Sequence, residues 1–135
     1  ISGQIIEKQD VDGNSTKYEY DSNGRLKKQT DFLGNVTEYN YNLRGELIEV
    51  IYSDGTTELY VYDTMGRLYA SKVRHAIGKK GNGYRIIYNA VGKIIRTDKL
   101  AAVDIAVNDR NTALIGYSEL ISSIEEVQSP AALKL

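Results

Sequence analysis

Tyr18-Glu19-Tyr20-Asp21-Ser22-Asn23-Gly24-Arg25-Leu26 is the stretch that decides the fold, because the chain repeats it twice at intervals of 21 residues. The later copies are Tyr39-Asn40-Tyr41-Asn42-Leu43-Arg44-Gly45-Glu46-Leu47 and Tyr60-Val61-Tyr62-Asp63-Thr64-Met65-Gly66-Arg67-Leu68. A second signal keeps the same interval, at Asp12-Gly13, Leu33-Gly34 and Asp54-Gly55. A fixed period is the signature of a repeat architecture, so each copy should form one structural unit.

Each copy holds two turn signals. Asp21 to Gly24 fits a type I turn with Gly at the last position, and Asp54-Gly55 is typical of a tight two-residue hairpin loop. The segments between the turns have about the length of a common strand. One copy therefore predicts one β-hairpin, and successive hairpins should lie side by side in an antiparallel sheet.

The repeat extends beyond the three clear copies. Gly3 and Ile5 stand one period before Gly24 and Leu26, and Ile86 to Ile94 is a degraded fourth copy after an insertion around His75 to Gly83. We predict a mainly β fold in which residues 1–97 form an antiparallel meander of about four hairpins and eight strands in one twisted sheet. Residues 98–135 should be a helical or mixed capping segment within the same compact unit.

Alternation along strands predicts the two faces of this sheet. One face should be apolar in every copy: Tyr18, Tyr20, Leu26, Tyr39, Tyr41, Leu47, Ile51, Tyr60, Tyr62, Leu68, Ile86, Tyr88 and Ile94. The second face is polar early, but late in the sheet it should carry Ile48, Val50, Tyr52, Leu59, Val61, Tyr69, Val73, Ile87 and Ile95. Exposure of so many apolar side chains is unfavourable, so the capping segment should cover the later repeats.

Within the capping segment, the apolar spacing from Thr112 to Val127 is typical of a helix, with Pro130 beyond its end. Residues 100–117 are ambiguous. Val103, Ile105 and Val107, followed by Asn108 to Asn111, could be a strand and turn leading into Leu114. We favour a hairpin or short helix near 100–110 and then the helix.

Composition is that of a soluble globular protein, with 41% hydrophobic and 26% charged residues among 135. The net charge is -1, yet residues 72–99 hold eight basic groups and one acidic group. No run approaches the roughly 20 apolar residues of a membrane span, so we predict no membrane insertion. The chain opens on Ile1 rather than Met, which indicates a fragment or a processed product.

The repeated unit with its paired Asp-Gly turn resembles the YD repeat of bacterial RHS (rearrangement hotspot) proteins, to which repeats of animal teneurins are related. The resemblance covers about residues 1–97, with departures at Asn42, Glu46 and Ile86, where the pattern has Asp, Arg and Tyr. It implies hairpins that coil into a hollow shell around a C-terminal toxin, in secreted or cell-surface proteins. It also implies carbohydrate binding, which has been attributed to such repeats.

Two groups of residues are candidate binding sites. A tyrosine ladder could pack across strands or offer a platform to sugar rings or a partner's apolar surface; it comprises Tyr18, Tyr20, Tyr39, Tyr41, Tyr60, Tyr62 and Tyr88. A basic group could be a solvated loop facing the acidic tail or could bind an acidic protein partner; it comprises Lys72, Arg74, Lys79, Lys80 and Arg85. Nucleic acid is the weakest partner, since Tyr84 is the one stacking group at hand.

Reactive chemistry is scarce. Asp21, Asn42, Asp63 and Asn89 recur just before turns, and capping their own turns is simpler than converging on Ca²⁺, which takes six or more oxygens. His75 is the single His and there is no Cys, so no histidine-based metal cluster can form. We predict no catalytic residue, no cofactor and no metal.

These patterns leave three functional hypotheses. The first is a non-enzymatic structural and protein-binding module, a short section of repeat wall from a bacterial secreted, cell-surface or toxin-delivery protein. Its open sheet edges would accept further repeats or a partner protein. The second is a stand-alone binding protein, either a toxin-immunity factor or a carbohydrate-binding module. The third makes the tail a toxin or enzyme, although few residues remain there to build a site.

Overall fold

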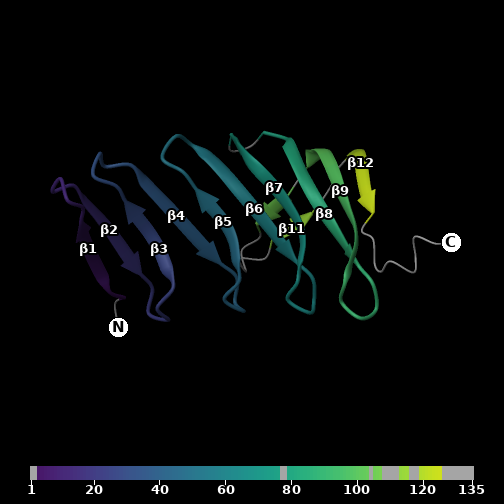
Figure 1. The fold of residues 1–135 in the computed structure, drawn as a ribbon, viewed down its shortest axis with the longest axis horizontal. Coiled ribbons are helices and arrows are strands. Elements are labelled where there is room, and N and C mark those ends of the chain that lie inside the picture. Colours follow the sequence, from purple (N-terminus) through teal and green to yellow (C-terminus); the bar gives the residue numbers. More distant parts are fainter. Residues whose placement is uncertain (1–2, 77–78, 104, 108–112, 116–118, 126–135) are drawn as a thin grey trace.

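The computed structural model describes residues 3–76, 79–103, 105–107, 113–115 and 119–125, and all regular elements among them are strands (Figure 1). One antiparallel sheet of ten strands runs in chain order from β1 to β9 and ends with β12. Its strands are β1 (Ile5–Gln9), β2 (Ser15–Tyr20), β3 (Leu26–Thr30), β4 (Val36–Tyr41), β5 (Leu47–Ile51), β6 (Thr56–Tyr62), β7 (Leu68–Ala76), β8 (Gly81–Tyr88), β9 (Ile94–Val103) and β12 (Glu119–Glu125). The predicted antiparallel meander is confirmed.

Seven hairpin turns share one geometry. In the turn that begins at Asp21, the Gly24 amide donates to the Asp21 carbonyl and the Asp21 amide donates to the Arg25 carbonyl, at 3.0 and 2.8 Å. Gly24 has a φ of +77°, a conformation that costs a non-glycine residue about 1–2 kcal/mol. The predicted turn at Asp21 to Gly24 is confirmed.

The loop at Asp54-Gly55 differs from the prediction. The Gly55 amide donates to the Tyr52 carbonyl, and the Tyr52 amide donates to the Thr56 carbonyl. The loop therefore has three residues, with Gly55 at a φ of +82°, as in the other turns. The prediction of a two-residue loop was wrong because a left-handed glycine also closes the three-residue hairpin.

A one-residue bulge follows every second turn and changes the phase of the side chains. Between β4 and β5, Tyr41 pairs with Leu47 and Asn40 pairs with Glu49, which leaves Ile48 as the extra residue. The same irregularity occurs between β2 and β3, between β6 and β7, and between β8 and β9. Two residues of one strand then oppose one residue of the other, so alternation from the turn no longer gives the face.

Three face assignments in β5 and the following turn were therefore wrong. Val50 pairs with Tyr39 on one side and Glu58 on the other, so it lies on the tyrosine face. Ile51 pairs with Glu38 and Thr57 on the second face. The third corrected residue is Tyr52, whose hydroxyl donates to Glu58 on the tyrosine face. Ile48 is the extra residue of the bulge, and it belongs to the buried cluster with Leu59 and Val61 of the second face.

The second face of the later strands carries the core. Leu59 and Val61 of β6 are buried there, as predicted. The buried cluster comprises Ile48, Leu59, Val61, Ala70, Leu100, Val103 and Ile105. Ile105 belongs to β10 (Ile105–Val107), which pairs with β11 (Ala113–Ile115) in a separate two-stranded sheet. Since β11 also contacts β6, this hairpin covers the second face of the later repeats.

The predicted helix over 112–127 is not formed. Its described residues lie in β11 and in β12, and β12 pairs antiparallel with β9. The strand–turn–strand alternative for 103–114 matches β10 and β11, and its turn at 108–111 lies outside the described residues. β-Branched Ile121 and Ile124 favour a strand, and the outer edge of β9 supplies backbone partners. The division of the chain at residue 97 stays a prediction.

Candidate functional site

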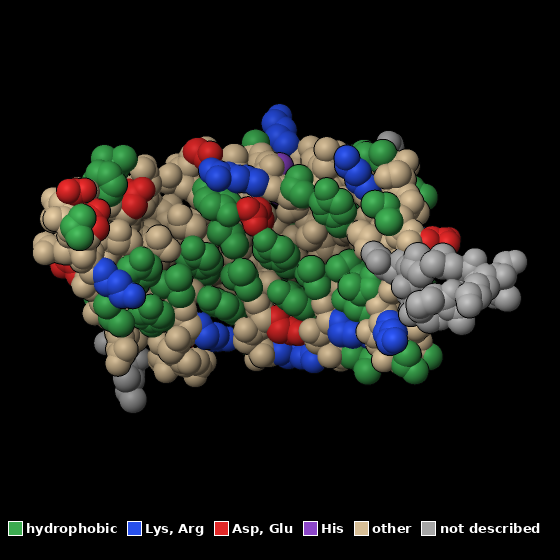
Figure 2. All heavy atoms as spheres, viewed as in Figure 1, with side chains coloured by type: hydrophobic (Ala, Val, Ile, Leu, Met, Phe, Trp, Pro, Cys, Tyr) green, Lys and Arg blue, Asp and Glu red, His purple; other side chains and the backbone are tan. Residues whose placement is uncertain are grey.

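All seven tyrosines of the predicted ladder lie on one face. The pairings that connect them run from Tyr18 through Gln29 to β4, from Tyr39 through Val50 to β6, and from Tyr60 through Ser71 to β8. Figure 2 shows this face, opposite the β10–β11 hairpin, with a band of hydrophobic side chains across the strands. Each of the seven is partly buried, so the ladder is packed yet reachable.

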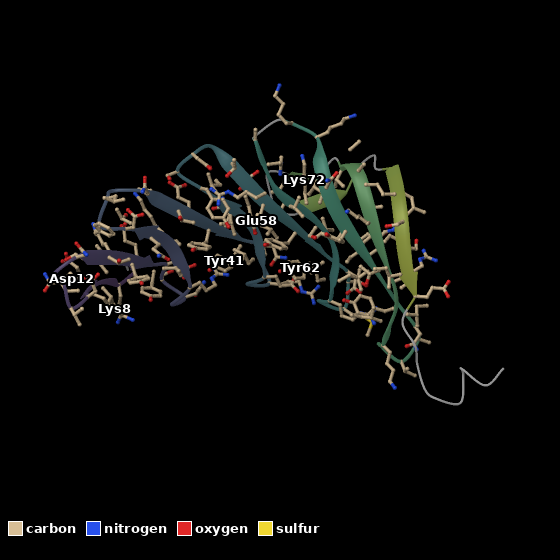
Figure 3. The ribbon with its side chains drawn as sticks, turned by 45° about the horizontal axis from the view of Figure 1, so that its top comes forward. Lys8, Asp12, Tyr41, Glu58, Tyr62 and Lys72 are labelled. Carbon is tan, nitrogen blue, oxygen red and sulfur yellow. The ribbon has the colours of Figure 1, made fainter. Side chains whose placement is uncertain are left out.

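In three of the repeated units, the tyrosine at the second position joins its hairpin to the preceding one. The Tyr41 hydroxyl donates to the Leu26 carbonyl at 2.6 Å, and the Tyr62 hydroxyl donates to the Leu47 carbonyl at 2.8 Å. Tyr88, in the degraded copy, repeats the bond to Leu68 at 2.7 Å. Burial is the main reason that the pKa of Tyr41 and of Tyr62 is raised. Figure 3 shows Tyr41 and Tyr62 at neighbouring positions along the same side of the sheet.

The Asp and Arg of the repeated unit complete the same junction. Asp21 accepts from the Asn23 and Arg25 amides through Oδ1 and from Arg25 Nε through Oδ2 at 2.8 Å. The hydrogen bond from the Arg25 amide is the main cause of the lowered pKa of Asp21. The Arg25 guanidinium lies 5.0 Å from the Tyr41 ring centroid, a cation–π contact.

Asp63, Arg67 and Tyr88 repeat this arrangement, with the guanidinium 4.3 Å from the ring centroid. The predicted capping of turns is confirmed by hydrogen bonds at Asp21, Asn42, Asp63 and Asn89. The described residues contain no group of three or more His, Cys, Asp or Glu that could hold a metal ion.

Sequence reasoning missed a polar cluster within the tyrosine face. Glu58 accepts hydrogen bonds from the hydroxyls of Tyr52 and Tyr60 at 2.6 and 2.5 Å. These two bonds, that of Tyr52 first, lower the pKa of Glu58. Arg74 lies 3.8 Å from the Tyr52 ring centroid. Glu58 and Tyr60 are two residues apart in β6, so the sequence could have placed this carboxylate on the tyrosine face. The bulge at Ile48 reverses the face of Tyr52, so the sequence could not show that Tyr52 lies beside it.

The comparison with known families agrees with this repeated geometry. Residues 2–36 and 20–57 each match the model of the RHS Repeat. This part of the chain belongs to the RHS-repeat family. The junctions of Tyr62 with Leu47 and of Tyr88 with Leu68 continue the RHS-repeat geometry beyond the matched residues. No curated protein matches the sequence.

The structure does not gather the predicted basic residues into one patch. Lys72 is 5% exposed, and its ammonium donates to the Lys79 carbonyl. Arg85 is paired with Asp98 at 2.8 Å, and Arg74 is paired with Asp54 at 2.8 Å. Lys79 and Lys80 are exposed. Lys72, Arg74 and Arg85 thus each bond to another part of the chain, and a role for the group in binding an acidic partner stays a prediction.

Two cavities lie between successive hairpins of the sheet. One of about 300 Å³ is lined by Asn42, Leu43, Arg44, Glu46, Ile48, Tyr60, Tyr62, Asp63 and Thr64. The other, of about 400 Å³, is lined by Gly3, Gln4, Ile6, Tyr20, Asp21, Ser22 and Gly24. Most of these positions correspond when the numbering is moved by two repeat periods. Among the described residues, no helix is long and apolar enough to cross a membrane.

Proposed function

We propose that this chain is a non-enzymatic structural and protein-binding module, a section of RHS-repeat wall from a secreted, cell-surface or toxin-delivery protein. The observation that supports it is the use of the signature residues. In the unit of residues 60–68, the Tyr62 hydroxyl contacts the preceding hairpin, Arg67 lies over the Tyr88 ring and Asp63 caps the turn. Arg25 and Asp21 act in the same way in the first unit. In solenoid-like arrays such nearest-neighbour contacts supply most of the stability.

The partner in this proposal is a strand that adds to the free side of β1. All five residues of β1 are exposed. Tyr20 donates to the carbonyl of Gln4 at 2.8 Å, so Gln4, Ile6 and Lys8 direct their backbone groups toward β2. Because bonded and non-bonded positions alternate in an antiparallel pair, Ile5 and Glu7 direct theirs outward. A further RHS repeat, or a strand of a partner protein, would pair with them.

Sedimentation equilibrium of the full chain tests this proposal, with a second copy as the partner. We expect concentration-dependent association that Glu7→Pro abolishes, because proline removes an outward N–H and obstructs the edge while the inward groups still bond to β2. Glu7→Ala is the matched control and should associate like the parent. A parent chain that stays monomeric, or association unaffected by Glu7→Pro, would contradict edge pairing.

A second candidate function is carbohydrate binding on the tyrosine face. It is favoured by partly exposed phenol rings in adjacent rows together with the Glu58 carboxylate, since sugars combine apolar ring faces with hydroxyls. Binding on a glycan array that disappears in Tyr39→Ala or Tyr60→Ala would support it. An array without signal for the folded parent chain would rule it out.

The proposed compartment is extracellular or at the cell surface, as is typical of RHS-repeat proteins. A toxin or enzyme in the tail is the least favoured hypothesis. It would require toxicity on expression that is lost when the chain is trimmed after Thr97.

A further inference from the structure

The four junctions between successive turns differ at one position of the repeat. This position, which follows the turn glycine, is Gln4, Arg25, Glu46 and Arg67 in chain order. Where it is arginine, the guanidinium fills the junction. Arg25 lies over the ring of Tyr41, and Arg67 lies over that of Tyr88, at 5.0 and 4.3 Å from the centroids.

Both arginines also reach the glycine of the next turn. A Cβ placed on Gly45 would lie 3.4 Å from Arg25 Nη1, and one on Gly92 would lie 3.7 Å from Arg67 Nη1. The two cavities between hairpins occur at the other two junctions, those of Gln4 and Glu46. In two of the four junctions, the space between neighbouring turns thus holds a guanidinium group.

At the third junction, Glu46 places a negative charge where Arg25 and Arg67 carry a positive one, and a cavity remains beside it. Glu46 Oε1 accepts from Asn42 Nδ2 at 2.9 Å, and Oε2 would lie 3.0 Å from a Cβ on Gly66. The Glu46 side chain is 18% exposed, so its carboxylate is largely withdrawn from water. Among the described residues no guanidinium lies over the Tyr62 ring, whereas Tyr41 and Tyr88 each have one.

Arg44 is the cation closest to this carboxylate. Its Nε lies 3.8 Å from Glu46 Oε1, its Nη1 donates to the Thr64 carbonyl at 3.2 Å, and its side chain is 54% exposed. Asp63, which also lines the cavity, is paired with Arg67 at 2.8 Å. Arg44 Nη2 would lie 3.1 Å from a Cβ on Gly66, so this partly exposed side chain reaches the next turn glycine, and an entering guanidinium has to displace it.

We propose that the cavity between the Asn42 turn and the Asp63 turn binds an arginine side chain of a partner protein. The guanidinium lies over the Tyr62 ring and bonds the Glu46 carboxylate, in the place that Arg25 and Arg67 fill in the neighbouring junctions. Guanidinium groups both stack on aromatic rings and bond carboxylates in a planar fork. This site lies at the turns and does not depend on pairing along β1.

Blocked arginine (N-acetyl-arginine methylamide), titrated into ¹⁵N-labelled full chain, tests the assignment. We expect saturable shifts of the amides of Glu46, Thr64 and Gly66. Blocked citrulline, the uncharged isostere, and blocked lysine, which lacks the planar fork, should each bind about tenfold more weakly. Equal binding of arginine and citrulline, or shifts spread over the whole surface, would overturn the proposal.

Variants sharpen this test. Glu46→Gln should weaken arginine binding about tenfold, and Arg44→Ala should strengthen it, since the resident cation is removed. Asn42→Asp combined with Glu46→Arg recreates the residues of the flanking junctions and should abolish binding by filling the cavity from within. Its amide spectrum reports folding independently. Undiminished binding by a folded Asn42→Asp/Glu46→Arg chain, or by Glu46→Gln, would refute the site.

Discussion

Replacement of Asp98 by Asn should be the most informative single change to stability. Asp98 is fully buried in β9, at 0% exposure. Its carboxylate accepts from Arg85 of β8 and Arg96 of β9 at 2.8 Å each, and from the Ser123 hydroxyl of β12 at 2.7 Å. One carboxylate therefore joins three strands, including the edge strand that the sequence did not predict.

The magnitude follows from the pKa of Asp98. Burial alone would raise this pKa, but hydrogen bonds from Ser123, Arg85 and Arg96 outweigh burial and lower it from 3.8 to about 2. At about 1.4 kcal/mol for a tenfold change in an equilibrium constant, the shift corresponds to up to about 2 kcal/mol of stability. The folded-state pKa is lowered, so this stabilisation is present above pH 4 and is lost as the pH falls toward 2.

Urea unfolding followed by far-UV circular dichroism measures the effect. Asp98→Asn should lower the free energy of unfolding by about 2 kcal/mol at pH 7, and the difference from the parent should shrink at pH 2.5. Asp12→Asn, in an exposed turn, is the matched control and should change little. A difference below about 0.5 kcal/mol at pH 7, or one that does not change with pH, would refute the reasoning.

Three further predictions concern the repeat junctions and the core. Gly83→Ala should destabilise the fold by at least about 2 kcal/mol in urea unfolding, since the added Cβ would lie 2.1 Å from the Ser71 carbonyl oxygen; an unchanged midpoint would contradict that approach. Tyr62→Phe should cost about 1 kcal/mol in the same assay, through loss of the bond to a carbonyl of β5; an equal or higher stability would show that the bond contributes nothing. Asn42→Asp with Glu46→Arg should raise stability by about 1 kcal/mol, more than the two single changes together; strict additivity in the double-mutant cycle would disprove the coupled junction.

Much of the sheet could be predicted from the repeat itself. Turn residues at a fixed interval specify hairpins, and Tyr39, Tyr41, Tyr60 and Tyr62 occupy one face because they precede the bulge in each hairpin. Val50 follows the bulge, and there simple alternation assigned the wrong face. A bulge adds one residue without a compositional signature, so only the pairing of strands reveals it.

The C-terminal part was less predictable for a different reason. Apolar residues spaced by three and four fit a helix, but short apolar runs do not distinguish helix from strand. Leu120 and Ile124 instead lie in an edge strand, with 60% and 67% of their surfaces exposed. What decided the outcome was the open side of β9 and the buried carboxylate of Asp98, neither of which is visible in local sequence. The cavities, by contrast, could have been located from the residue after each turn glycine.

The positions at which a copy departs from the repeated pattern indicate more about binding than the positions that all copies share. In a full unit, Arg25 forms an ion pair with Asp21 and a cation–π contact with the Tyr41 ring. The charged groups of the junction therefore already have partners within the chain, and little charge is left to bind a ligand. Where Asn42 and Glu46 replace the Asp and the Arg, the amide donates to the new carboxylate at 2.9 Å. The turn is retained, the arginine at this position of the repeat is lost, and Arg44 lies beside the carboxylate instead. The two changes thus preserve the hairpin and leave a cavity and a carboxylate that can receive a partner's cation, which makes the Glu46 junction the place where this wall can be specific.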